Sequence, residues 1–134
     1  FQSTITQWIE IGNEDLQFAK HGLSMSSNVP YRLIAFHSQQ CAEKYLKAYL
    51  LFKNVDFPYT HNITTLLDLC GEKDSSFEHL RDAEKLTGFA IAMRYPGEYR
   101  KLKKADATQA LKLADKVLSF VRNKLSGEGF PLKK

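Results

Sequence analysis

The polar residues best suited to chemistry lie on one side of a strongly apolar stretch, residues 36–51. In an α-helix, spacings of three and four residues place side chains on one face. At about 100° per residue, one sector of about 120° collects five polar side chains. They are His37, Gln40, Glu43, Lys44 and Lys47. Ammonium groups bind phosphates, while an imidazole and an amide hydrogen-bond to a base, so this polar face is the first candidate site.

Two interpretations of the polar face stay open. In the first, Glu43 and Lys47 form an exposed ion pair worth about 0.3–0.5 kcal/mol, and Gln40 and Lys44 are only solvated. In the second, lysines and an arginine bind phosphates while the other polar groups hydrogen-bond to or stack on a base. The nucleotide-binding candidates of the second interpretation are His37, Gln40, Lys44, Lys47, His61, Arg94 and Tyr95.

The histidines and glycines exclude several other kinds of site. None of the four histidines has a metal-ligand spacing such as H-E-x-x-H, so we expect no metal. His61, which follows Thr60, is more often a structural loop histidine bonded to a backbone carbonyl than a catalytic base. The sequence has no glycine-rich phosphate loop and no G-x-S-x-G, so we expect no cofactor and no serine hydrolase.

The candidate site is positioned by a helix that we predict from about residue 30 to 53. Its apolar residues cover roughly two thirds of the circumference, as expected for a helix buried on several sides. Apolar residues at steps of three and four predict further helices at about 4–22, 62–71, 75–94 and 106–125. Their predicted N-terminal caps are Thr4, Asn62, Ser75 and Asp106, and Gly22 and Gly71 are predicted to end two of them. The fold class is therefore all-α, an antiparallel bundle of four main helices and one short helix.

Length and composition limit the remaining choices. A chain of 134 residues with 43% hydrophobic residues is expected to form one domain, residues 1–134. Two cysteines without a repeated spacing favour a reducing cytoplasm and argue against a disulfide framework. No apolar run approaches the ~18 residues that span a bilayer. The net charge of +4 allows a nucleic acid or nucleotide partner without requiring one.

Four short motifs in register resemble the HEPN family, helical domains found in higher eukaryotes and prokaryotes and named for nucleotide binding. The resemblance covers about residues 4–125. Its motifs are Trp8 with Asp15-Leu16 and Ala19, Phe36-His37-x-Gln39-Gln40-x-Ala42-Glu43-Lys44-x-Leu46-Lys47-Ala48, Thr60-His61, and Arg94-Tyr95-Pro96. The resemblance implies dimers with a ligand cleft between subunits. It also implies a small nucleotidyltransferase as partner, sometimes within a toxin–antitoxin system.

Many HEPN proteins share an R-x(4–6)-H ribonuclease motif, which this chain lacks where the resemblance would place it. Residues 94–99 read Arg-Tyr-Pro-Gly-Glu-Tyr, with tyrosine in place of histidine. Tyrosine is a poor base near neutral pH because its pKa is about 10. Arg32 and His37 fit the spacing, but five helical residues separate their side chains by about 140°. We therefore expect a non-catalytic binding module.

Two alternatives to the binding module stay open. The first is a metal-independent ribonuclease that uses Arg94 or Arg32 with His37 or His61. The second is a structural dimerisation subunit without nucleotide affinity.

The aromatic content predicts a homodimer. Nine phenylalanines, six tyrosines and one tryptophan are more large apolar groups than one small core covers, and exposed apolar surface usually marks an interface. We expect the polar face near the two-fold axis, so that Gln40, Lys44 and Lys47 of both copies line one groove.

Overall fold

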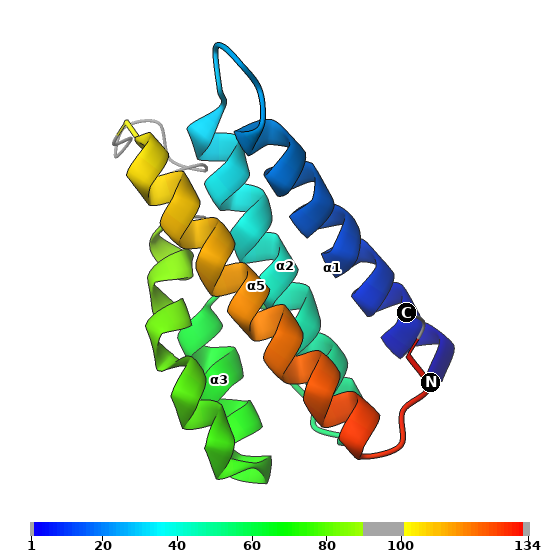
Figure 1. Cartoon of the computed structure of the whole chain (residues 1–134). Coiled ribbons are helices and arrows are strands. Elements are labelled where there is room, and N and C mark those ends of the chain that lie inside the picture. The colour runs from blue at the N-terminus through cyan, green and yellow to red at the C-terminus, as the bar shows by residue number, and fades with distance from the viewer. Residues whose placement is uncertain (1, 90–100, 133–134) are drawn as a thin grey trace.

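The computed structural model describes residues 2–89 and 101–132, and every regular element in these ranges is helical. The elements are α1 (Gln2–Leu23), α2 (Tyr31–Phe52), α3 (Ile63–Lys73), the 3₁₀ helix η1 (Ser75–Lys85) and α5 (Lys104–Gly127), as Figure 1 shows. The predicted all-α fold class is confirmed. In the described part of the chain, no helix is both long and apolar enough to cross a membrane.

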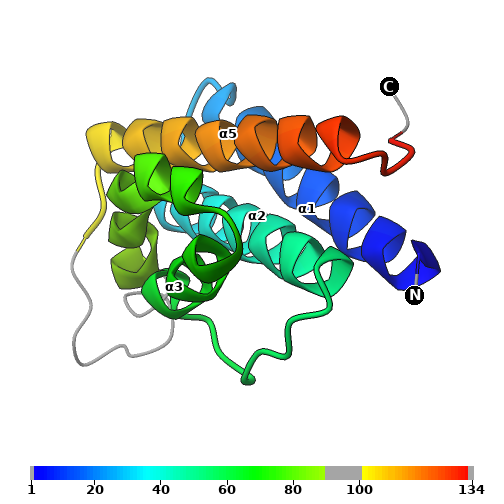
Figure 2. The ribbon, with the colours of Figure 1, turned by 90° about the horizontal axis from the view of Figure 1, so that it is seen from below.

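The three long helices lie side by side, and α3 with η1 packs against them as a shorter arm (Figures 1 and 2). α1 and α2 are antiparallel, whereas α5 begins at the same end of the bundle as α2. One pocket accordingly joins residues 29–33 to Lys101 and Leu102. Another joins Tyr49 and Lys53 to Asn123, Lys124, Gly127 and Glu128. The first turns of α2 and α5 therefore lie at the same end of the bundle.

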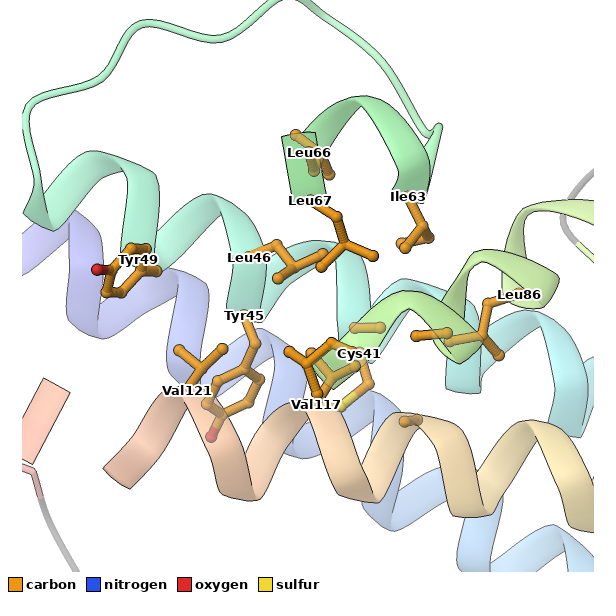
Figure 3. Packing of buried hydrophobic residues seen from close by; sticks show 14 of the residues in the cluster. Cys41, Tyr45, Leu46, Tyr49, Ile63, Leu66, Leu67, Leu86, Val117 and Val121 are labelled. Carbon is orange, nitrogen blue, oxygen red and sulfur yellow. The ribbon is translucent and has the colours of Figure 1, made fainter. Parts of the chain in front are cut away.

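α2 is the central helix, as its apolar circumference predicts. It packs against α1, α5 and α3, and residues 45–50 of α2 are all buried. Figure 3 shows Leu46 between the α3 side chains and Val117 of α5, with Cys41 and Tyr45 beside it. This burial holds the α2 backbone rigidly, so the polar side chains on α2 project from a fixed support.

The predicted helix starts are only partly correct. Asn62 caps α3, where its side chain accepts a hydrogen bond from the backbone N–H of Thr65. Asp106 does not cap α5, because the helix starts two residues earlier and Asp106 instead accepts from the backbone N–H of Lys103 at 2.8 Å. The residue before the predicted Ser75, Asp74, caps η1. α1 already begins at Gln2, so Thr4 lies inside it.

The two glycines predicted to end helices both lie inside them. α1 continues to Leu23 and α3 to Lys73, because burial of their apolar faces outweighs the roughly 1 kcal/mol cost of an internal glycine. Gly22 serves close packing instead: a Cβ atom there would lie 3.0 Å from Cγ1 of Ile34. α1 and α2 therefore approach closely at this glycine.

Candidate functional site

Six polar side chains along α2 and the following loop form one hydrogen-bonded chain, which we call the α2 polar network. It runs from Lys44 through Gln40 and Gln39 to Glu43, where Lys47 and His61 also bind. Five of its members come from α2, and His61 comes from the loop before α3. The network therefore links the half-buried surface of α2 to its buried interior.

Glu43 is the centre of the network and is 2% exposed. Its carboxylate accepts from His61 Nδ1 at 2.8 Å, from Lys47 Nζ at 3.0 Å and from Gln39 Nε2 at 3.1 Å. Burial alone raises the pKa of this carboxyl, but hydrogen bonds from His61, Lys47 and Gln39 outweigh it and bring the pKa below its usual range. Glu43 is therefore a buried anion at neutral pH.

The order of donors and acceptors fixes both glutamine amides. Lys44 can only donate, so Gln40 turns its oxygen to Lys44 at 2.7 Å and its nitrogen to the Gln39 oxygen at 2.7 Å. Gln39 then directs its nitrogen to Glu43 and to the backbone carbonyl of His61 at 2.9 Å. Flipping either amide would place a hydrogen-bond donor against a donor and an acceptor against an acceptor. The outer Lys44 and Gln40 are thus held in place by buried partners.

Lys47 lies inside the protein, which corrects the exposed-pair interpretation of Glu43 and Lys47. Its side chain is 6% exposed, and its ammonium lies 5.6–5.9 Å from the ring centres of Trp8, Phe57 and Tyr59. Such rings attract a cation through their negative faces. The side chain is buried because the loop before α3 and the first half of α1 both close over it.

His61 is held by a carboxylate rather than by the backbone carbonyl that a structural loop histidine would use. Its Nδ1 lies 2.8 Å from Glu43, and its side chain is 26% exposed. The ring of Tyr59, which is 91% exposed, lies edge-on to it at 5.5 Å. A hydrogen bond from Nδ1 to a carboxylate sets the tautomer of the imidazole and leaves Nε2 as the reactive nitrogen. This arrangement suits a general acid–base catalyst or a hydrogen-bond donor to a phosphate.

His37 lies on the same side of α2 but outside the network. Its Nδ1 pairs with Asp15 of α1 at 2.9 Å, and its ring packs edge-on against Phe18.

The structure brings together four predicted site residues in the α2 polar network, namely Gln40, Lys44, Lys47 and His61. Arg94 and Tyr95 lie outside the described residues.

Sequence reasoning gives no functional role to Glu43 or Gln39, although both are in the network. The helical spacing presents Glu43 only as a surface partner of Lys47, and Gln39 lies outside the polar sector. Both residues belong to the motif on which the family resemblance rests, and that is the available signal.

Within residues 2–89 and 101–132, no group of three or more histidine, cysteine or acidic side chains could hold a metal ion. Cys41 and Cys70 are both buried, and burial raises their thiol pKa values, so neither is a reactive nucleophile. The hydrogen-bonded side chains of the α2 polar network remain as the candidate site.

The lowered pKa of Glu43 predicts sensitivity to acid. A carboxyl whose pKa is lower in the folded state than in the unfolded state stabilises the folded protein at pH values above the unfolded pKa, which is about 4.3 for glutamate. This stabilisation is lost as the pH falls through the pKa of the folded state. We expect the free energy of unfolding to fall below about pH 4 more steeply than in Glu43→Gln. Denaturant titrations between pH 3 and 6 measure this, and identical slopes for the two proteins would contradict it.

Comparison with known proteins identifies the family. The HEPN domain model matches residues 5–124. The crystal structure of TT1696 from Thermus thermophilus is similar, with a TM-score of 0.75 and 30% identity over 90% of this chain and 98% of that chain. ST0689, an archaeal HEPN homologue, shares the fold, with a TM-score of 0.70 and 24% identity over 90% and 97% of the two chains. No curated protein matches significantly. The chain belongs to the HEPN domain family.

Proposed function

We propose that this HEPN domain is a non-catalytic module that binds nucleotides or nucleic acid at the α2 polar network. The observation that carries the proposal is the fixed orientation of the outer groups, Lys44, Gln40 and His61, by the buried Glu43 and Gln39. Groups held in the bound geometry lose little freedom when a ligand arrives, so each hydrogen bond contributes more to affinity.

The chemistry of the outer groups suits a nucleotide. The ammonium of Lys44 pairs with phosphate oxygens, the imidazole of His61 donates to them from Nε2 when protonated, and the exposed ring of Tyr59 offers a stacking surface for a base. Lys47 is buried against Glu43 and acts by positioning the carboxylate.

Calorimetric titration with ATP, GTP and a short RNA tests the proposal. We expect binding by the parent and at least roughly tenfold weaker binding by Lys44→Gln, since a hydrogen bond to a charged group contributes about 1.5–3 kcal/mol. Lys73→Gln is the matched control, because Lys73 is an exposed lysine in the pocket beside the C-terminal end of α2. This control is expected to bind like the parent. Absence of heat with all three ligands, at millimolar concentrations, would reject the proposal.

We further propose that the domain is a homodimer. α1 carries Ile11 and Phe18, which are 43% and 50% exposed, seven residues apart on the side of α1 that carries Asp15, the partner of His37. A second copy would cover these side chains and bring two networks to one groove. Light scattering after size exclusion is expected to give twice the 15.3 kDa of one chain. A monomer mass at all concentrations up to near-millimolar would exclude the dimer.

Family membership supports a small nucleotidyltransferase as the protein partner, in a toxin–antitoxin setting. The gene next to this one is expected to encode it.

The alternative function, a metal-independent ribonuclease, is favoured by one observation, the orientation of His61 by Glu43. Equal background cleavage of an RNA pool by the parent and His61→Ala, without divalent metal, would exclude that alternative.

A further inference from the structure

The loop that carries His61 is fixed at its C-terminal end by one hydroxyl group. Ile63, the first residue of α3, donates its backbone N–H to Oγ1 of Thr87 at 3.0 Å. Thr87 lies 24 residues further along the chain, just after the 3₁₀ helix η1. The first N–H groups of a helix have no partner inside it, and Ile63 is fully buried. The hydroxyl of Thr87 therefore satisfies an N–H group that would otherwise be costly to bury.

The bond to Thr87 complements two contacts between His61 and α2. The backbone carbonyl of His61 accepts from Nε2 of Gln39 at 2.9 Å, and Nδ1 of His61 donates to Glu43 at 2.8 Å. Ile63 is only two residues further along, so a shift of its backbone would also move the backbone of His61. The orientation of the imidazole toward Glu43 therefore depends on Thr87 as well as on α2.

Thr87 is held in place by η1, whose buried residues recur at strict steps of three. Phe77, Leu80, Ala83 and the C-terminal cap Leu86 are all at most 1% exposed. Residues three apart lie above one another in a 3₁₀ helix, but each step of three turns the side chain by about 60° in an α-helix. An α-helix would therefore place Leu86 about 180° from Phe77, on the side of the solvent. The sequence favours the 3₁₀ form here, although long runs of it are uncommon.

A second stripe at steps of three faces α3 and includes Thr87. Arg81 of this stripe pairs through Nη1 with Asp68 of α3 at 2.8 Å, and through Nη2 with Glu78 at 2.9 Å. Arg81 and Thr87 are six residues apart, so they share a face of a 3₁₀ helix but would lie about 120° apart on an α-helix. The 3₁₀ form therefore allows both contacts with α3 at once. In this way η1 sets Thr87 opposite the first residue of α3.

We propose that Thr87 is a positioning residue of the α2 polar network, which holds the start of α3 and through it orients the imidazole of His61 for a ligand. Thr87 itself is not one of the groups that contact the ligand. The arm formed by α3 and η1 thus belongs to the binding site, although none of its side chains is in the network. The effect on ligand affinity rests on the proposed function, whereas the effect on the His61 ring does not.

Calorimetric titration with ATP compares three variants with the parent. Thr87→Val keeps the shape of the side chain but cannot accept the bond from Ile63. It is expected to weaken binding roughly tenfold, the lower end of what loss of a residue that orients a ligand-binding group costs. Thr87→Ser keeps the hydroxyl and is expected to bind within about twofold of the parent. Thr64→Val makes the same change beside Ile63, where the half-buried hydroxyl has no hydrogen bond in the described part of the chain, and is expected to bind like the parent.

A double variant tests whether Thr87 acts through His61. Effects of two residues that act through one group do not add. Thr87→Val is therefore expected to weaken binding no further in a His61→Ala background, in which Lys44 still binds phosphate. Equal losses from Thr87→Val and Thr64→Val, equal losses from Thr87→Val and Thr87→Ser, or additive losses with His61→Ala would overturn the proposal.

The ¹H–¹⁵N spectrum of the His61 imidazole, recorded without ligand, separates this proposal from the proposed function. The ring proton is expected on Nδ1, facing Glu43, in the parent and in Thr87→Ser. In Thr87→Val we expect an Nε2–H signal to replace part of the Nδ1–H signal, with circular dichroism showing that the variant is folded. If the parent does not bind ATP, the proposed function fails and the ring signals alone decide the role of Thr87. Unchanged ring signals in Thr87→Val would overturn the proposal in either case.

Discussion

Replacing Glu43 by alanine is expected to destabilise the protein by about 3–5 kcal/mol. The carboxylate is the common acceptor of Lys47, His61 and Gln39, and without it the ammonium of Lys47 is a buried charge with no anionic partner. Leaving one member of a buried ion pair uncompensated costs far more than loss of a surface pair. Urea denaturation followed by circular dichroism measures the change.

A double variant separates this mechanism from simple loss of packing. Glu43→Leu with Lys47→Met removes both charges and keeps apolar volume, so it is expected to recover much of the stability lost in Glu43→Ala. A loss below about 1 kcal/mol in Glu43→Ala would instead indicate a solvated pair of the surface kind.

Substitution of Gly12 by alanine is expected to destabilise the protein by about 1–3 kcal/mol, because the added methyl group overpacks the interface of α1 and α2. A Cβ atom at this position would lie 2.9 Å from Cδ2 of Tyr45 and 3.4 Å from Cβ of Lys44. The Tyr45 ring is fully buried, and its hydroxyl is bonded to Asn13 and Arg122, so it has no room to move. α1 would have to shift away from the α2 polar network.

Gly71→Ala provides the matched control for Gly12→Ala. Gly71 also lies inside a helix, but its added Cβ would meet only the flexible Glu78 side chain at 3.8 Å. Here the gain in helix propensity is expected to dominate and to stabilise the protein by about 0.4–1 kcal/mol. If thermal unfolding showed that both alanines stabilise, the close contact at Gly12 would be less rigid than the structure indicates.

The helices and the central place of α2 could be predicted because apolar periodicity reports which side of a helix is buried. Helix ends were less predictable. Asp106 and Asp74 show why: several neighbouring residues can cap a helix, and packing of the whole helix decides which one does. The common direction of α2 and α5 is the one that the predicted antiparallel bundle gives to its second and fourth main helices.

The sequence predicted which residues of the candidate site lie on the polar side of α2, but not how deeply each of them is buried. Spacing alone placed Lys44 and Lys47 on one side of α2, but it could not show that Lys47 is buried and Lys44 half-buried. That difference arises from Trp8 on α1 and Phe57 and Tyr59 on the loop, which are distant in sequence from Lys47. The partner of His61 likewise depends on how the loop folds back onto α2.

Backbone amide chemical shifts during a titration with ATP, recorded by ¹H–¹⁵N NMR, test most directly whether the α2 polar network is the binding site. We expect the largest changes at Gln40, Lys44 and His61, with the same residues losing their response in Lys44→Gln. Unchanged amides at these three positions in the presence of saturating nucleotide would contradict binding at the network.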